Sequence, residues 1–264
     1  MDLNSTIYTF PHEKIGFVSL IDKSSCDFPL KIVNAARLSY SKQKQELEER
    51  DRKLIGYLFD HSHTSPFRHS YYTFHIKATL SVFRQWTKYQ VGSTWRTYEL
   101  NNTSADPTVS IDIFDILFDT DKGCSWNEIS RRYTSPKEEF YIPDLLRSNP
   151  SHGNKQSSGD YSNPLSTHDI HFIDKPLELM SSFTKESINL YNKLIMNGVA
   201  KEQARDILPV NLYSEAYWTV SLQAIMHFLT QRCSKDAQFE IKQYALAIKS
   251  LIADDLDRAG IKIE

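Results

Sequence analysis

The sequence predicts an α+β fold. Segments with the alternating or β-branched composition of strands lie in the first part of the chain, whereas long segments with helical spacing of apolar residues fill the last part. Strands that come early and helices that come late favour the α+β class. The chain has 264 residues, of which 40% are hydrophobic and 24% charged, enough for one large globular domain or two small ones.

The part of the chain before residue 92 predicts two strands and three helices. Residues 15–21 are short and apolar, and residues 70–79 alternate and are rich in Tyr, Thr, Phe and Ile, as strands are. Residues 29–36 begin a helix, and residues 46–61 carry Leu and Ile at helical spacing until a His-Thr-Ser-Pro turn ends them. Residues 80–91 are expected to form the third helix.

The rest of the chain predicts two long loops and then helices. Residues 93–123 have mostly loop composition, with a candidate strand at 111–118. Residues 147–168 are rich in Ser, Asn, Gly and Pro and form a long loop, which at this length is either functional or disordered. Four helices follow, at residues 177–197, 201–207, 214–233 and 235–255.

Charge and cysteine content restrict the function classes. The net charge of −2 argues against broad nucleic-acid binding, so any anionic ligand needs locally clustered Arg and Lys. No segment approaches the roughly 20 apolar residues that span a bilayer, and the polar N-terminus is not a signal peptide. The 3 cysteines are widely spaced and fit reduced thiols. We therefore expect a cytoplasmic protein that binds neither nucleic acid nor membrane.

A basic cluster split into two segments is the most informative feature. Residues 84–92 (RQWTKYQVG) place Arg84, Gln85 and Lys88 close together on a helix, and residues 125–133 (SWNEISRRY) add hydroxyl and guanidinium donors. Together these groups could hold a phosphate and the polar edge of a ring, as a nucleotide requires. A solvated basic helix face is the alternative.

Motifs for other chemistries are weak or absent. The sequence has no GxGxxG after a strand, no P-loop and no HExxH. His61 and His63 lie two residues apart, but no cysteine or carboxylate pattern completes a metal site around them. Cys124 could be a nucleophile that transfers a methyl group to a pyrimidine, but no basic helix is obviously placed to activate it. We expect a bystander thiol and no metal.

Several segments, in order and spacing, resemble flavin-dependent thymidylate synthases, which methylate dUMP with a folate and without a cysteine nucleophile. Residues 35–40 (AARLSY) are similar to the family's AARxSY segment, and residues 63–69 (HTSPFRH) to its HxSPFEH turn. Residues 127–133 (NEISRRY) resemble NExSxRY, the most specific segment. The resemblance extends along nearly the whole chain, including residues 51–55, 73–78, 198–213 and 218–247.

The resemblance implies a mixed, largely antiparallel sheet flanked by helices, in one domain over residues 1–264. It implies that NADPH reduces bound FAD, that methylenetetrahydrofolate supplies the carbon, and that the reduced flavin supplies the hydride that completes the methyl group. It also implies a homotetramer with active sites built across subunits.

The family's binding residues carry over to this chain position by position. The resemblance assigns to dUMP the residues Gln85, Lys88, Glu128, Ile129, Ser130, Arg131, Arg132, Arg205 and Arg232. Arg232 is the catalytic candidate, because a guanidinium beside the uracil could stabilise negative charge that builds on the ring as C5 becomes nucleophilic. The resemblance assigns to FAD the residues Ser65, Lys88, Tyr89, Gln90, Val91, Glu128, Gln223 and His227.

Each assignment has a structural alternative. Arg205 and Arg232 could cap the C-terminal ends of their helices. His227 could be a buried core histidine, although it lies four residues from Gln223 and could share a helix face with it. The two glutamines, Gln85 and Gln223, could be surface amides.

The family's Arg-His-Arg triplet is altered in this chain. Lys88-Tyr89-Gln90 stands in its place, so an imidazole and the bidentate fork of an arginine are lost. Tyr89 could equally serve packing alone. Residues 93–123 form an insertion between the two halves of the basic cluster, which a loop tolerates because closure entropy grows slowly with length.

Three further positions near the expected flavin site also depart from the family pattern. Arg68 stands where the family has Glu, Gln223 where many members have Arg, and His227 where many have Asn. Three hypotheses follow: a flavin-dependent thymidylate synthase, a relative that places a different one-carbon group on a pyrimidine nucleotide, and a catalytically silent nucleotide-binding protein.

Overall fold

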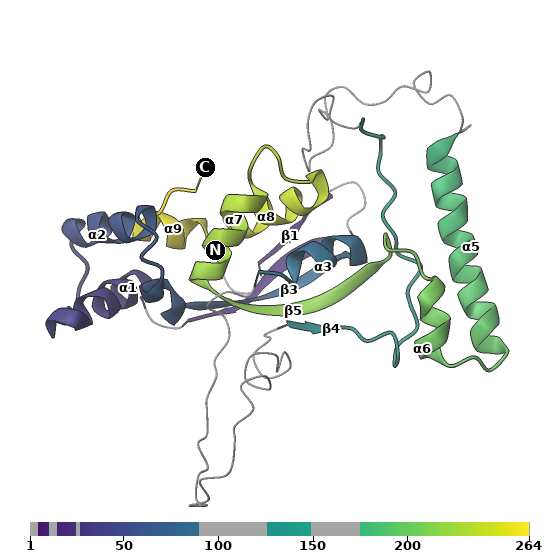
Figure 1. Cartoon of the computed structure of the whole chain (residues 1–264), viewed down its shortest axis with the longest axis horizontal. Helices are drawn as coiled ribbons and strands as arrows, with labels where there is room; N and C mark the ends of the chain where they lie inside the picture. The colour runs from purple at the N-terminus through teal and green to yellow at the C-terminus, as the bar shows by residue number, and fades with distance from the viewer. Residues whose placement is uncertain (1–4, 11–14, 25–26, 90–125, 149–174, 264) are drawn as a thin grey trace, which may run out of the picture.

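A computed structural model describes residues 5–10, 15–24, 27–89, 126–148 and 175–263. Its centre is one five-stranded sheet with strand order β1-β2-β3-β5-β4 (Figure 1). The strands are β1 (Thr6–Tyr8), β2 (Phe17–Lys23), β3 (Tyr71–Thr79), β4 (Trp126–Glu128) and β5 (Tyr213–Ser221). All four pairings are antiparallel. The predicted α+β class is confirmed, and within the described residues the sheet is antiparallel rather than mixed.

The helices lie on one face and at both ends of the sheet (Figure 1). They are α1 (Phe28–Arg37), α2 (Glu49–Asp60), α3 (Leu80–Trp86), α5 (Pro176–Met196), α6 (Lys201–Ala204), α7 (Leu222–Arg232), α8 (Phe239–Leu251) and α9 (Ala253–Ala259). Short 3-10 turns are η1 (Leu38–Tyr40), η2 (Ser65–His69) and η4 (Arg205–Ile207). In the described part of the chain, no helix combines the length and apolar character that crossing a membrane requires.

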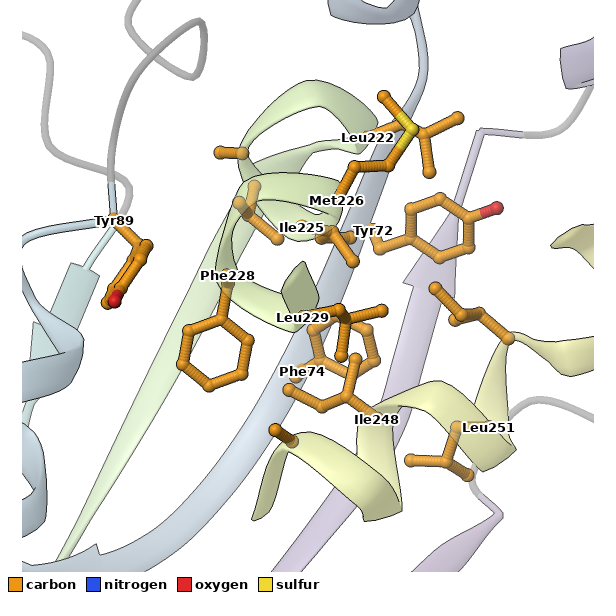
Figure 2. Packing of buried hydrophobic residues seen from close by; sticks show 14 of the residues in the cluster. Tyr72, Phe74, Tyr89, Leu222, Ile225, Met226, Phe228, Leu229, Ile248 and Leu251 are labelled. Carbon is orange, nitrogen blue, oxygen red and sulfur yellow. The ribbon is translucent and has the colours of Figure 1, made fainter. Parts of the chain in front are cut away.

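An aromatic core lies between the sheet and the helices. Trp86 of α3 stacks on Phe228 of α7 with ring centroids 4.9 Å apart, and its edge meets Trp218 of β5 at 5.5 Å. Phe74 of β3 contacts Trp218 at 6.0 Å. Figure 2 shows Phe228 and Phe74 packed with the aliphatic side chains of α7 and α8. Such ring pairs add about 0.5–1.5 kcal/mol each beyond simple burial, so they fix α3 and α7 against the sheet.

The helix predicted at residues 214–233 is wrong in its first half. Residues Tyr213–Ser221 are strand β5, which pairs with β3 along its whole length, from Tyr71 opposite Ser221 to Thr79 opposite Tyr213. Side chains of Ala216, Trp218 and Val220 alternate into the core, and aromatic and β-branched residues favour this extended form. The apolar residues of β5 run directly into those of α7, so helical periodicity misplaced the boundary.

Other differences concern boundaries and short elements. The helix predicted at 80–91 ends at Trp86, and the one at 235–255 divides into α8 and α9 at Ile252. Strands β1 and β4 span three residues each, too few to give an alternating pattern, and were not predicted. Residues 93–123 and the loop beyond residue 148 lie outside the described residues.

Candidate functional site

The C-terminal ends of α3 and α7 meet above the middle of the sheet. Each helix directly follows a central strand and begins with an N-cap hydroxyl. Thr79 Oγ1 accepts from the backbone N–H of Val82, and Ser221 Oγ accepts from that of Ala224. Since β3 and β5 are antiparallel, the two helices start at opposite ends of the sheet. Their last turns therefore converge, and most predicted site residues lie there or on the side of α7.

Tyr89, His227 and Arg232 form one cluster at this point of convergence. The Tyr89 ring lies 5.5 Å from the His227 ring and 5.0 Å from that of Phe228, and the Arg232 guanidinium carbon lies 5.3 Å from the Tyr89 centroid. Tyr89 is buried, and Figure 2 shows its ring beside Phe228. A cation over an aromatic face is held electrostatically. The structure therefore brings together a predicted uracil contact and two predicted flavin contacts.

The structure bears on the alternatives for two of these residues. His227 is exposed in the chain, so it is not a core histidine. Arg232 lies in the last turn of α7, where its charge also suits the C-terminal end of the helix, so the capping alternative stays open. The buried Nε of Arg232 has no hydrogen-bond partner among the described residues and is free to meet a ligand atom or a water.

A second contact joins the start of α7 to the turn that precedes β3. The Nε of Arg68 donates to Oε1 of Gln223 over 2.6 Å, so Gln223 is not a free surface amide. Buried Pro66 and Phe67 anchor this turn, and Ser65 and Arg68 on it are exposed. Gln223 and His227 thus place two predicted flavin contacts along one side of α7.

The loop after β4 holds the predicted phosphate donors. Backbone N–H of Ile129 donates to the carbonyl of Glu215, which extends the pairing of β4 with β5. The Nε of Arg132 then donates to Ser130 Oγ over 3.2 Å, so a hydroxyl and an exposed guanidinium lie side by side. Glu128 and Ile129 are also exposed in this segment.

Arg131 binds backbone carbonyls and so holds the loop after β4 in place. Its guanidinium donates to the carbonyl of Tyr213 at 2.9 Å and to that of Ser135 at 3.2 Å. Burial lowers the pKa of Arg131, while nearby carboxylates, that of Glu128 foremost, oppose the shift. The geometry therefore gives Arg131 a positioning contact, and its side-chain contact to a nucleotide stays a prediction.

Helix α6 borders the same loop. Lys201 Nζ donates to the carbonyl of Tyr133 over 3.1 Å. Arg205, which follows α6, is exposed, and its Nε donates to the carbonyl of Glu202 at 3.2 Å. This bond is the helix-capping alternative, although it occupies only one nitrogen of the guanidinium. Within the described residues, no hydrogen bond or ion pair joins Ser130, Arg132 or Arg205 to the Tyr89 cluster.

The remaining predicted residues have varied settings. Gln85 donates to Gln238 and is half-buried, so it is not a free surface amide. Lys88 is exposed. Gln90, Val91 and Cys124 lie outside the described residues. His61 stacks on Tyr57, and the described part of the chain contains no group of three or more potential metal ligands.

A hollow beside the turn η2 was not predicted. It has a volume of 550 Å³ and lies along α1, next to η2, lined by Asp27, Leu30, Lys31, Asn34, Ala35, Leu38, Gln43 and His69. Its lining includes two residues of the AARLSY segment, Ala35 and Leu38, which the sequence motifs do not assign to a ligand. Sequence pattern alone could not place α1 beside the turn at 65–69, because the two segments are far apart in sequence.

The chain is similar to known proteins over most of its length. A family model described as thymidylate synthase complementing protein matches residues 20–256. The flavin-dependent thymidylate synthase of Thermosipho africanus is 35% identical over 239 residues, which cover 90% of this chain and 86% of the relative. That of Thermus thermophilus is 34% identical over 256 residues, or 97% of this chain and 78% of the relative.

A solved structure is also similar. It is the UMP/dUMP methylase PolB from Streptomyces cacaoi, bound with 5-Br dUMP. The TM-score is 0.65 at 28% identity, over 92% of this chain and 93% of the other.

Proposed function

The chain belongs to the family of flavin-dependent thymidylate synthases, and on this premise we propose that it converts dUMP to dTMP. The proposal takes FAD as the bound cofactor, with NADPH and methylenetetrahydrofolate as co-substrates. The observation that carries it is the cluster of Tyr89, His227 and Arg232, because it combines aromatic rings with a guanidinium whose Nε lacks an acceptor among the described residues. A flat ligand that carries negative charge suits both groups.

The described residues fit a flavin. Gln223 and His227 present polar groups along α7, and Ser65 and Arg68 present a hydroxyl and a guanidinium on the adjoining turn. The hollow of 550 Å³ beside that turn has room for further parts of a dinucleotide. When bound, FAD supplies the hydride chemistry that side chains lack.

The chain's own residues would bind and polarise the nucleotide. We assign Arg232 to the uracil, where its charge would stabilise the electron density that builds on the ring as C5 attacks the carbon donor. Tyr89 would hold this guanidinium by a cation–π contact. Removing a fixed donor of this kind typically costs 100-fold or more in rate, about 3 kcal/mol.

Ser130, Arg132, Lys88 and Arg205 would bind the phosphate and sugar. In one chain, no hydrogen bond or ion pair of the described residues connects Ser130, Arg132 or Arg205 to Arg232. We propose that a homotetramer joins the two groups across subunits. Helix α5 supports this proposal, because it exposes large apolar side chains at Leu179, Phe183, Leu190 and Met196.

The test is tritium release from C5-labelled dUMP by the full chain. We expect release that requires FAD, NADPH and methylenetetrahydrofolate together. A folded protein that binds dUMP but releases no tritium would instead be the silent nucleotide-binding protein.

A second candidate activity is methylation of UMP. It is favoured by the structural similarity to a methylase described as acting on both UMP and dUMP. Parallel assays with C5-labelled UMP and dUMP, followed by identification of the product, separate the candidates. Thymidylate as the sole product excludes both UMP methylation and transfer of a different one-carbon group.

A further inference from the structure

A chain of hydrogen bonds connects Gln85 to a buried carboxylate. The Nε2 of Gln85, in the last turn of α3, donates to Oε1 of Gln238, the residue before α8. The Nε2 of Gln238 donates in turn to Oε2 of Glu240 over 2.8 Å. Side chains that are remote in sequence therefore form one series of hydrogen bonds, which begins at the predicted substrate residue Gln85 and ends at Glu240.

Glu240 is the fixed end of this hydrogen-bond series. It is 7% exposed and lies in the first turn of α8, where the helix dipole favours a negative charge. Arg147 forms an ion pair with its other oxygen, and the Arg147 guanidinium carbon lies 5.0 Å from the centroid of the Phe239 ring. Tyr141 donates to the same oxygen at 3.5 Å. A carboxylate that is paired with a guanidinium accepts hydrogen bonds and donates none.

This arrangement determines which way both amides face. Because Glu240 only accepts, Gln238 must turn its NH₂ toward it, which leaves the Gln238 carbonyl as the acceptor for Gln85. Gln85 must then turn its own NH₂ inward. Within the described part of the chain, its carbonyl Oε1 has no hydrogen-bond donor and remains for a ligand. A neutral partner at position 240 would permit both amides to reverse.

We propose that Glu240 is a positioning residue that fixes the orientation of Gln85, so that Gln85 presents a hydrogen-bond acceptor to the nucleotide. The proposal rests on the proposed function, which places dUMP at Gln85. An acceptor suits a proton donor of the nucleoside, the sugar 3′-hydroxyl or the uracil N3–H, and it repels a phosphate oxygen. This inference removes Gln85 from the expected phosphate contacts and leaves that task to the cationic residues.

The test is a double-mutant cycle of Glu240→Gln and Gln85→Glu in the flavin-loaded full chain, with dUMP affinity measured by calorimetry. Glu240→Gln permits the reversed orientation, so we expect about tenfold weaker dUMP binding, or about 1.4 kcal/mol, with flavin content unchanged. In Gln85→Glu, a carboxylate oxygen faces the Gln238 carbonyl. In the double variant, Gln238 can reverse and donate to Glu at position 85, so we expect about tenfold better binding than the two single effects predict.

Two further variants complete the design. Glu49→Gln makes the same change in the first turn of α2, away from these hydrogen bonds, and should bind dUMP as wild type does. Gln238→Met removes the central amide of the hydrogen-bond series but keeps the ion pair of Glu240 with Arg147. It therefore tests the orientation of Gln85 even where Glu240→Gln folds poorly. It should weaken dUMP binding with kcat less affected than KM.

The outcomes separate the two proposals. Additive single effects in a protein that binds dUMP would overturn the orientation proposal alone, whereas wild-type protein that binds no dUMP would overturn the proposed function. A readout without nucleotide is the side-chain amide signal of Gln85 in NMR spectra. Its shift should move in Glu240→Gln and not in Glu49→Gln, and an unmoved signal in Glu240→Gln would also overturn the proposal. Comparing dUMP with its 3′-deoxy and N3-methyl analogues identifies which donor faces Gln85.

Discussion

The Nε of Arg68 donates to Oε1 of Gln223 across 2.6 Å and joins two positions 155 residues apart in sequence. Both positions depart from the family pattern that the sequence resemblance implies, with Glu expected at the first and Arg at the second. Here the positive group is on the turn and the neutral acceptor is on α7. Relative to the expected family residues, the donor and acceptor exchange places, and we expect the two departures to compensate each other at the proposed flavin site.

This exchange predicts coupled effects on flavin binding. Arg68→Glu removes the guanidinium donor and reverses the charge on the turn, and Gln223→Arg places two guanidinium groups together. We expect each single variant to lose about tenfold in flavin affinity. The double variant, which carries the expected family residues at both positions and can form an ion pair, should recover most of it. Flavin titration by fluorescence quenching measures all four proteins. Strictly additive losses would show that the contact does not organise the site.

Arg232→Ala should abolish turnover with little loss of folding. The side chain is half-buried and packs on Tyr89, but its Nε satisfies no acceptor among the described residues. Its removal therefore breaks no hydrogen bond of the fold at Nε. We expect a rate loss of at least about 100-fold and a melting temperature within a few degrees of wild type. Arg232→Lys, which keeps charge but loses the planar fork, should retain intermediate activity. Turnover near wild type in the alanine variant would mean that the role is misassigned.

Tyr89 should matter through its ring rather than its hydroxyl. The ring contacts Phe228, His227 and the Arg232 guanidinium, and the residue is 7% exposed. Tyr89→Phe should therefore keep stability and tritium release near wild type, whereas Tyr89→Ala should lose about 3 kcal/mol in urea unfolding and most turnover. A large loss in Tyr89→Phe would instead give the hydroxyl a chemical role.

Sequence patterns predicted helices well where one face is buried, as for α2 and α5, and failed where a strand runs into a helix. The alternation of β5 and the helical spacing of α7 share one continuous apolar run, and only the pairing with β3 separates them. Tertiary pairing, which periodicity cannot report, therefore decided the secondary structure of residues 213–221.

The candidate site was predictable where a motif is local and not where contacts are distant. Ser130 and Arg132 lie two residues apart, so one motif located both, and the structure places their side chains together. Other contacts connect segments that meet only after folding. These are the hydrogen bond between Arg68 and Gln223 and the series of hydrogen bonds from Gln85 to Glu240. Neither has a spacing that a sequence pattern could reveal.

Asp51 should make stability depend on acid pH. Its fully buried carboxylate accepts from Arg37 and Lys44, each at 2.7 Å, and from the backbone N–H of Glu48 at 2.9 Å. Burial alone would raise the pKa of Asp51, but the Lys44 and Glu48 hydrogen bonds and the charges of Lys44 and Arg37 outweigh it and lower the pKa. The contribution is therefore complete above the unfolded value of about 4 and is lost as pH falls through the folded pKa.

Asp51→Asn tests this dependence. It leaves Arg37 without its carboxylate partner and Lys44 with that of Glu48 alone, so we expect about 3 kcal/mol less free energy of unfolding near neutral pH and a shrinking difference below about pH 4. Urea unfolding across this range measures it. Asp60→Asn, an exposed change at the end of the same helix, should show no such loss. A difference that stays constant with pH would mean that the carboxylate charge is not the cause.

Deleting residues 93–123 should leave a folded protein. The segments on either side of this stretch are already held together, because Trp126 of β4 meets the rings of Phe83 at 5.0 Å and Trp86 at 6.5 Å on α3. Strand β4 also pairs with β5 independently of the deleted residues, with Trp126 opposite Trp218. Joining Gly92 to Cys124 therefore closes a shorter loop between fixed ends, and closure entropy changes slowly with loop length. We expect cooperative thermal unfolding within about 4 °C of the full chain. Loss of cooperative unfolding would show instead that these residues belong to the core, and tritium release by the folded deletion variant would show whether they are needed for activity.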